Sequence, residues 1–488
     1  MKAVVIGAGL GGLATAIRLL AAGHRVTVVE ARPQPGGRAS RIADRGYCFD
    51  TGPSLITMPE VLDDLFAVAG TSIARELRLR RLDPFYRIAW EGEERDFRFT
   101  GDREQMIEQV GRFSGADAGR FDDFMAASRR INEEAIEVAG RKAFLDLGTF
   151  LRLVPRMAQL GALRSVDGFV GRFFREPHVR QVFGFHPLFV GGDPFRVPAV
   201  YAALAYLQIA GGVWYSDGGV WSLVDAMARL VSAGGELRTG DAVTEIVRRG
   251  DRAVGVRTAA GELIEADLVV SNADVVTTRR SLLGLGGPDP RLTMSCFLLY
   301  LGVRRKFPQL QHHTLLVGAD YRGFISDVTA TRRLPESLSL YLHAPSRTEP
   351  AMAPAGGESL AVLLPVPNLG SGFDWSAAEE PLRERVLDLL EADRGLGLTG
   401  LRDAIEVEHR WTPHTFRDDL RSPQGNAFGP EPLLWQSAYF RQPNRDRKIA
   451  GLYYAGAGTH PGAGIPGVLL TASVTAGVIA NDLRVGRL

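Results

Sequence analysis

The sequence predicts an α/β protein with a parallel sheet, and three observations predict it. A glycine-rich turn follows the first short apolar run, an acidic residue closes the second run, and another glycine-rich turn precedes the last apolar segment. Strands of a parallel sheet are covered on both faces, so they read as short continuous apolar runs rather than as alternating ones.

Length, charge and cysteine content narrow the class of protein. The 488 residues exceed a typical single domain, so we expect two or three lobes that share one cleft. The formal net charge is +1 and no block of one sign stands out, which argues against nucleic acid as a partner. Cys48 and Cys296 show no partner spacing, which predicts neither a metal site nor a disulfide and fits a reducing cytoplasm.

The first elements follow one another within about thirty residues, as a βαβ unit requires. Residues 3–6 predict a strand, residues 13–20 a helix ending near Gly23, and residues 26–29 a second strand. This order is typical of a Rossmann-like dinucleotide-binding domain, and the alternative is a glycine-rich turn that binds nothing. The predicted roles are the tight turn for Gly7, the approach of the backbone to a pyrophosphate for Gly9, with Gly11 in the same turn, and close packing of helix on strand for Gly12.

An acidic residue and a second glycine pair indicate which nucleotide binds. Glu30, followed by Ala31, closes the second strand, where a carboxylate can accept hydrogen bonds from ribose hydroxyls. Gly36, Gly37 and Arg38 come next. A second backbone approach and a guanidinium beside the phosphates suit FAD better than a nicotinamide dinucleotide. The alternative for Arg38 is a surface arginine after a turn.

The rest of the chain changes pattern several times. The predicted segments are mostly helices and loops over 59–216, short strands over 235–273, and mixed structure over 275–430. A strand, a glycine-rich turn and a helix then follow over 452–455, 456–467 and 468–483. The short strands predict a meander that returns to the nucleotide-binding sheet.

The apolar run at 3–22 could be a signal peptide, but its spaced glycines and the strand that follows favour the nucleotide-binding unit. No other window reaches the ~20 uninterrupted apolar residues that a spanning helix needs.

The glycine turn, Glu30 and the Gly-Gly-Arg segment resemble the fingerprint of an FAD superfamily that includes amine oxidases, protoporphyrinogen oxidases and carotenoid desaturases. Amine oxidases commonly carry an acid where this chain has Gly458. The run 455–467 instead resembles the signature of the bacterial-type phytoene desaturases of the carotenoid desaturase family. Further matching blocks lie at 49–54, 183–194, 212–219, 341–345, 365–370, 412–418 and 436–441.

The resemblance implies a two-dinucleotide-binding-fold flavoprotein with three regions. These are a discontinuous Rossmann-like FAD domain (1–60, 217–290 and 445–488), a mixed-sheet substrate domain (61–140 and 291–444), and a helical, membrane-facing region (141–216). It also implies further FAD contacts, which are Gly37, Arg38, Gly52, Pro53, Ser54, Val243, Gly456, Gly458, Gly467 and Val468.

The resemblance further implies the chemistry. Family members oxidise phytoene or a related carotenoid by hydride transfer to the flavin and proton loss, with a quinone or oxygen as terminal acceptor. His460 and Asp418 are the candidate proton acceptors. The alternatives are that His460 only packs near the flavin and that Asp418 only pairs with Arg417. We expect His186 and His343 to be core histidines.

The insoluble polyene implies a membrane surface as a partner and a cytoplasmic, peripherally membrane-associated protein. Residues 144–175 carry apolar side chains flanked by arginines, which suits an anionic membrane surface. The alternative is an amphipathic helix packed on the body.

Other functions stay open from the sequence alone. Within enzymes these are diapophytoene, ζ-carotene or hydroxycarotenoid desaturation, a carotenoid oxygenase-type activity, and a more distant amine oxidase. Outside enzymes, the GDP-dissociation inhibitors of prenylated GTPases use a similar fold to bind lipid without redox chemistry.

Overall fold

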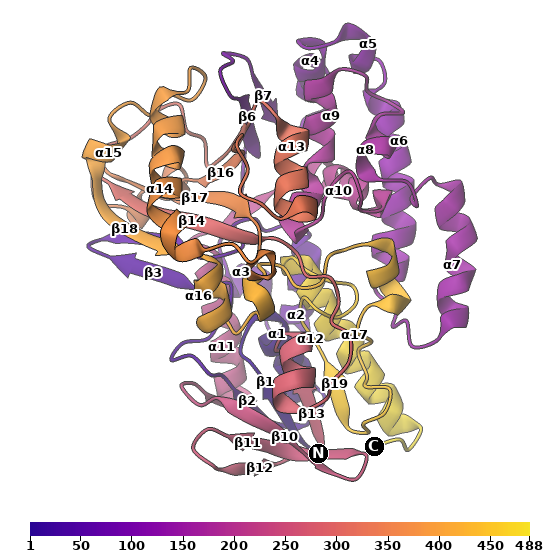
Figure 1. The fold of residues 1–488 in the computed structure, drawn as a ribbon. Helices are drawn as coiled ribbons and strands as arrows, with labels where there is room; N and C mark the ends of the chain where they lie inside the picture. The colour runs from indigo at the N-terminus through magenta and orange to yellow at the C-terminus, as the bar shows by residue number, and fades with distance from the viewer.

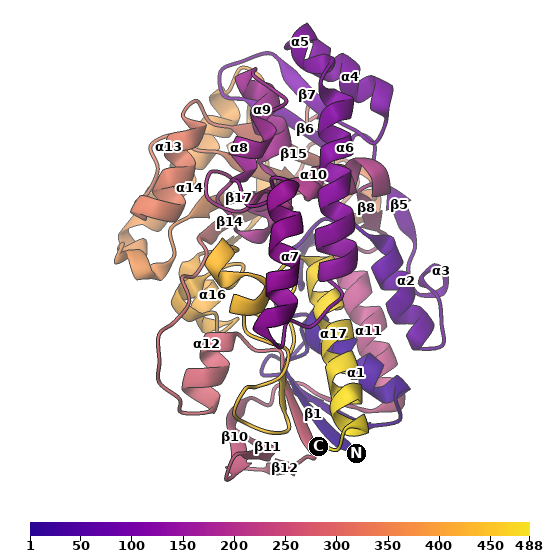
Figure 2. The same cartoon turned by 90° about the vertical axis from the view of Figure 1, so that its right-hand side faces the viewer.

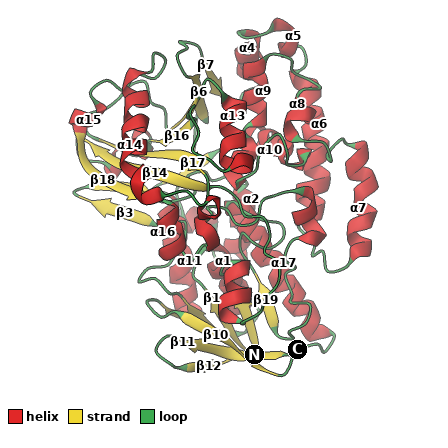
Figure 3. Ribbon diagram, in the orientation of Figure 1, coloured by secondary structure: helices red, strands yellow, loops and turns green.

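A computed structural model describes residues 1–488. Figure 1 shows two sheets at opposite ends of the molecule, with both termini at the end that carries the parallel sheet. Figure 3 shows that most helices of the far end gather on one side of the larger sheet.

The parallel sheet is the one that the sequence predicts. Its strand order is β19-β13-β1-β2-β9, and every pairing in it is parallel. The bounds are β1 (Lys2–Ile6), β2 (Arg25–Val29), β9 (Glu236–Arg238), β13 (Leu268–Ser271) and β19 (Leu452–Tyr454). Parallel strands buried on both faces explain the four consecutive buried residues of β13.

Three helices pack against this sheet. They are α1 (Leu10–Ala21), α11 (Val220–Gly234) and α17 (Ile465–Arg484), and α1 contacts both of the others. Two helices begin three residues earlier than predicted, at Leu10 and Ile465, because the glycine-rich turns before them already contain the first helical turn. By length and composition α17 could cross a membrane, but 56% of its apolar stretch is buried in the protein.

The predicted meander is confirmed as a three-stranded antiparallel sheet. It consists of β10 (Val243–Arg249), β11 (Arg252–Thr258) and β12 (Leu263–Glu265). The chain then returns to the parallel sheet through β13, as expected.

The second large sheet is mixed and has seven strands in the order β18-β14-β17-β16-β15-β6-β7. Their bounds are β6 (Tyr86–Trp90), β7 (Asp96–Phe99), β14 (Ser295–Val303), β15 (His313–Val317), β16 (Leu340–His343), β17 (Glu358–Val366) and β18 (Ile405–Trp411). The helices α13 (Tyr321–Ser326), α14 (Trp375–Ala392), α15 (Leu401–Ala404) and α16 (Pro413–Asp418) accompany it.

The stretch 59–216 is mostly helices and loops, as expected, but it also contains four short strands that the sequence did not reveal. These are β6, β7, β5 (Leu79–Arg81) and β8 (Trp214–Ser216). Strand β6 pairs with β15, which lies more than two hundred residues further along the chain. Such short strands form because of distant partners, so local pattern does not reveal them.

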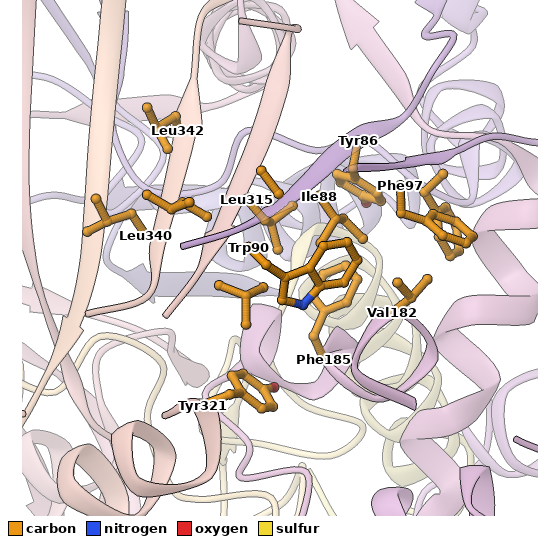
Figure 4. Packing of buried hydrophobic residues seen from close by; sticks show 14 of the residues in the cluster. Tyr86, Ile88, Trp90, Phe97, Val182, Phe185, Leu315, Tyr321, Leu340 and Leu342 are labelled. Carbon is orange, nitrogen blue, oxygen red and sulfur yellow. The ribbon is translucent and has the colours of Figure 1, made fainter. Parts of the chain in front are cut away.

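A helical layer covers one face of the mixed sheet. Its members are α4 (Arg103–Gly111), α5 (Gly115–Ala118), α6 (Phe121–Asn132), α7 (Leu147–Gln159), α8 (Val166–Val170), α9 (Pro177–Gly184) and α10 (Ala203–Gly211). Figure 4 shows Tyr86 and Trp90 of β6 among the buried side chains between sheet and helices, and the Tyr86 ring meets that of Phe185, which follows α9, edge-on at 5.9 Å. Figure 1 shows α7 at the outer edge of this layer, and in Figure 2 the same helix lies in front, facing the viewer. Met157 is its only buried residue.

The strands of the parallel sheet fall within 1–60, 217–290 and 445–488, and those of the mixed sheet fall within 61–140 and 291–444. Helices α2 (Pro59–Val68) and α3 (Ile73–Glu76) follow the hairpin β3 (Arg41–Asp44) and β4 (Tyr47–Asp50). Because α2 packs on α1 and α17, the cover of the parallel sheet continues past residue 60. The domain boundaries themselves stay a prediction.

Candidate active site

One cavity joins the two sheets. Its volume is about 630 Å³, and most of its lining residues are hydrophobic. It runs from the glycine turn after β1 to strands β15 and β16 of the mixed sheet, and to helix α7. The protein therefore places a long apolar space directly beside the predicted nucleotide site.

The carboxyl ends of β1, β13 and β19 build the first wall. Gly7 has φ +90°, which a glycine adopts without strain. A Cβ atom on Gly12 would lie 2.0 Å from the Gly7 carbonyl oxygen, so only glycine allows α1 to start this close to β1. A Cβ on Gly11 would lie 2.6 Å from Asn272 Oδ1 and 2.9 Å from Gly456 Cα, which shows how tightly the three loops meet.

Glu30 is buried at the end of β2 and is held from two sides. Its carboxylate accepts a hydrogen bond from Ala8 N at 2.7 Å and another from Arg32 N at 2.9 Å. These bonds fix the carboxylate beside the glycine turn, and each oxygen keeps a lone pair for a further donor. Ala31 lines the same part of the cavity.

Arg38 brings a cation to this wall. Its Nη2 donates to Ser422 Oγ at 2.7 Å, while its buried Nε has no hydrogen-bond partner. Burial lowers the pKa of Arg38, and the nearby Asp274 carboxylate opposes that shift. A buried guanidinium N–H without a partner is suited to an anionic ligand such as a phosphate.

Most of the other predicted cofactor contacts also lie on the cavity wall. These are Gly7, Gly9, Gly11, Gly37, Gly52, Pro53, Ser54, Val243, Gly456, Gly467 and Val468. Gly12 and Gly458 are not on the wall. A Cβ on Gly458 would lie 2.6 Å from Val275 Cγ2, so no acidic side chain fits where amine oxidases commonly carry one.

His460 lines the cavity and is 6% exposed. Its Nε2 donates to the Ala139 carbonyl oxygen at 3.2 Å, and its ring meets Phe144 edge-on at 4.8 Å. Nδ1 has no hydrogen-bond partner. Burial lowers the pKa of His460 to about 4, so the imidazole is neutral near pH 7 and Nδ1 carries a free lone pair.

Asp418 lies elsewhere. Its carboxylate is 56% exposed and pairs with the Arg417 guanidinium at 2.6 Å, and Asp418 does not line the cavity. The structure therefore matches the alternative in which Asp418 only pairs with Arg417, and we do not propose it as a proton acceptor. Its neighbour Asp419 lines the cavity instead.

Several polar wall residues were missed in the sequence. They are Asn272, Asp274, Tyr341, Asp419 and Ser422. Asn272 and Asp274 had a signal, because they follow a predicted strand of the parallel sheet, where ligands commonly bind. Tyr341 lies in one of the matching blocks, which gave it no role. The others come from the mixed sheet and its connections, so only the fold brings them to the site.

The cavity opens towards α7 and the loop that carries the short turns η10 (Leu434–Gln436) and η11 (Ala438–Phe440). Phe150 of α7 meets Phe440 edge-on at 5.3 Å, which joins the two segments. Large apolar side chains are exposed around this opening: Leu151 at 54%, Phe440 at 51% and Trp435 at 62%. We call this surface, comprising Leu147, Leu151, Leu163, Leu434, Trp435 and Phe440, the apolar rim.

The buried histidines predict that the protein loses stability in acid. Burial lowers the pKa of His186 and His343 to about 3 and that of His460 to about 4, and it lowers the pKa of His312 and His313 well below the usual value of a histidine. Unfolded histidines bind protons near pH 6.5, so the stabilisation is complete above that pH and falls as the pH drops towards 4.

At pH 5 each of these histidines lowers the free energy of unfolding by about 2 kcal/mol relative to its value at high pH. Asp50 acts in the opposite sense, because burial raises its pKa to about 7 and stabilises the fold at low pH. Burial also raises the pKa of Asp193, Asp274, Glu358 and Glu431, which act in the same sense as Asp50. Unfolded histidine titrates within the range from pH 7.5 to pH 5 and unfolded carboxyls titrate below it, so we expect the five histidines to decide the sign and the urea midpoint to fall over this range. A midpoint that stays constant or rises over this range would contradict the burial of the neutral rings.

Comparison with known proteins adds independent evidence. The family described as flavin containing amine oxidoreductase matches residues 10–480. A phytoene desaturase (lycopene-forming) of Pseudescherichia vulneris is 41% identical over 99% of this chain and 100% of its own length. A phytoene desaturase (neurosporene-forming) of Rhodobacter capsulatus is 39% identical over 98% and 94%. An oxidoreductase from Methanosarcina mazei, 18% identical, shares the fold with a TM-score of 0.64 over 98% of this chain and 100% of its own.

Proposed function

The chain belongs to the family of flavin-containing amine oxidoreductases, and from its similarity to the bacterial carotenoid desaturases we propose that it introduces double bonds into phytoene. It is an FAD-dependent oxidoreductase, as the sequence predicted. The observation that carries the substrate proposal is the long apolar cavity, which leads from the nucleotide loops to the apolar rim. A long hydrocarbon needs such a space, and a small polar amine does not.

The residues present fit FAD. The glycine turn leaves the first N–H groups of α1 without side-chain caps, and Arg38 keeps a buried N–H without a partner. Both features suit a pyrophosphate. The anchored carboxylate of Glu30 suits the ribose hydroxyls.

When bound, the flavin supplies the acceptor for the hydride equivalent that one substrate C–H bond gives up. The neighbouring C–H bond then releases a proton, and its electron pair becomes the new double bond. The protein's part is to hold the polyene in line with the cofactor, to exclude water and to receive the proton. The hydrophobic part of the wall performs the first two tasks, because it packs against a hydrocarbon and offers water few hydrogen bonds.

His460 stays one candidate for the catalytic residue that accepts the substrate proton. It is neutral, it lies on the cavity wall, and Nδ1 has a free lone pair. Its ring is held in place by the bond to Ala139 and by Phe144, so the lone pair keeps one direction.

We also propose that the apolar rim docks the protein on a membrane. Phytoene is insoluble in water, so it must enter from a lipid phase, and the cavity opens where large apolar side chains are exposed. Arg152 and Arg164 lie on or just after α7 beside these residues, which suits anionic lipid. Together with the two free cysteines, this supports a cytoplasmic, peripherally bound enzyme.

The test is desaturation by the purified protein. We expect the FAD-loaded protein to convert phytoene in liposomes into coloured polyenes of increasing conjugation, read by absorbance and chromatography. An anaerobic sample with a quinone and a sample in air identify the terminal acceptor, and the final product counts the steps.

Two other outcomes would redirect the proposal. Bound flavin with no product from phytoene would point to a sister substrate such as diapophytoene or ζ-carotene. A protein that binds prenyl lipid but never flavin would instead match the GDP-dissociation-inhibitor alternative.

A further inference from the structure

Three buried histidines lie beside the cavity and take no part in the function described so far. His313 is the first residue of β15 and pairs in register with His343 of β16, and His312 directly precedes His313. They are 0%, 2% and 5% exposed respectively. Each ring presents a nitrogen within 4.8 Å of a nitrogen on each of the others. Buried polar groups in such number need an explanation.

Hydrogen bonds connect this cluster to the cavity. Tyr341 and Ser54 both line the cavity, and their hydroxyl oxygens share a hydrogen bond at 2.6 Å. The Tyr341 hydroxyl also shares a hydrogen bond with His313 Nδ1 at 2.7 Å. The mostly apolar wall of the cavity thus carries a pair of hydroxyl groups, and this pair is hydrogen-bonded to the buried histidine cluster.

Further bonds connect the cluster to the surface. His343 Nε2 and His312 Nε2 are bonded at 3.2 Å, and His312 Nδ1 bonds Thr348 Oγ1 at 2.6 Å. Thr348 is partly exposed. Its neighbour Glu349 accepts a hydrogen bond from the Tyr215 hydroxyl, and the Tyr215 ring lies edge-on to His312 at 4.8 Å.

No hydrogen bond connects His313 directly to His343. His313 Nε2 is buried without a partner, and its ring stacks on that of His343 at 5.1 Å between centroids. The 4.8 Å limit on the nitrogen separations is a distance that a small ring movement or one bridging water can span. The remaining steps, from Tyr341 to His313, from His343 to His312 and from His312 to Thr348, are all hydrogen bonds.

We propose that Tyr341, His313, His343 and His312 form a path that carries the substrate proton from the cavity to Thr348 at the surface. This inference rests on the proposed function. The substrate C–H bond breaks, and its electron pair becomes the new π bond. The proton forms an O–H bond at the Ser54–Tyr341 end while another proton leaves at Thr348. The hydride equivalent goes to the flavin, so electrons and atoms balance.

The chemistry of the rings suits this task. A neutral imidazole has one donor and one acceptor nitrogen, so it can take a proton on one side as it gives one up on the other. Burial lowers the pKa of all three rings, so none holds a charge near pH 7. His460 has no such continuation, because its Nε2 donates to a carbonyl oxygen, which cannot pass a proton on.

The test uses two variants and a matched control in the FAD-loaded protein. Tyr341→Phe removes the hydroxyl at the cavity end. His313→Asn keeps a polar atom near the Nδ1 position but has no Nε2. Tyr300→Phe is the control, because Tyr300 is fully buried in the same sheet, its hydroxyl has no partner, and it does not line the cavity.

We expect both path variants to slow single-turnover desaturation by about 10²-fold, as for the loss of a general acid–base group. Flavin content and thermal midpoint should match those of Tyr300→Phe. In mixtures of H2O and D2O, a plot of the wild-type rate against the deuterium fraction should be curved, because several protons move together. The same plot for Tyr341→Phe should be a straight line.

Rates of Tyr341→Phe within twofold of Tyr300→Phe would overturn the path. So would a large effect of His460→Asn without any effect of Tyr341→Phe. A stoichiometric metal ion in the purified holoenzyme that His313→Asn removes would also overturn it, because the metal would occupy the ring nitrogens.

A further measurement needs no substrate and separates this inference from the proposed function. In protein labelled with 15N at histidine, the path requires three neutral rings at pH 7. It also requires a His313 Nδ1 signal that shifts in Tyr341→Phe and not in Tyr300→Phe. Charged rings, or an unshifted His313 signal, would overturn the path even if the protein desaturates no phytoene.

Discussion

Replacing Gly9 by leucine is expected to abolish FAD retention while the protein still folds. Gly9 is the residue before α1 and has φ −70° and ψ 170°, which any residue can adopt. A Cβ there would lie 3.1 Å from the amide end of Asn272, a flexible side chain, so the backbone need not move. The longer leucine side chain would fill the space before the helix, where the pyrophosphate has to approach the N–H groups.

The measurement is the flavin absorbance per protein after gel filtration, and we expect it to fall more than tenfold. Gly477→Leu is the matched control, because Gly477 lies exposed in α17 and a Cβ there would meet nothing within 4 Å. Stoichiometric flavin in Gly9→Leu would contradict the assignment of this turn to the cofactor.

The second large effect is expected at the apolar rim. Leu151→Asp combined with Trp435→Asp should weaken binding to anionic liposomes at least about 100-fold, because burying each side chain is worth roughly 1.5–3 kcal/mol. Both side chains are more than half exposed, so we expect the fold and the flavin content to stay unchanged. Sedimentation with liposomes measures the binding.

Leu263→Asp provides the control for this variant. Leu263 is 43% exposed on β12, which Figure 1 places far from α7. The control should bind liposomes as the wild type does. If the double variant binds equally well, the rim is not the membrane-docking surface, and entry of the substrate must be sought elsewhere.

The nucleotide-binding half was largely predictable from the sequence. Residues 3–6, 26–29 and 268–270 lie in buried parallel strands, whose continuous apolar runs are visible locally. The glycine turn could be assigned because its geometry is a local property: Gly7 has a positive φ, and Gly12 meets the Gly7 carbonyl only five residues away. The predicted starts of the helices were less accurate, since the glycines before them give no local signal of where the first helical turn begins.

The substrate half was not predictable in the same way. Strand β6 forms because β15 pairs with it, and Tyr341 reaches the cavity because β16 lies in the same sheet. Sequence alone left Asp418 and His460 as equal candidates, and the fold separated them: one is exposed beside Arg417, and the other is buried on the cavity wall.

The sequence by itself determined the family, the cofactor and the loops that surround the cofactor, because these depend on short-range patterns of glycine, acid and apolar residues. Only the tertiary structure decided the course of the cavity, the position of the apolar rim and the meeting of His312, His313 and His343 with Tyr341. These features depend on contacts between segments that are far apart in the chain, and the energy of such contacts comes from packing and burial rather than from local pattern.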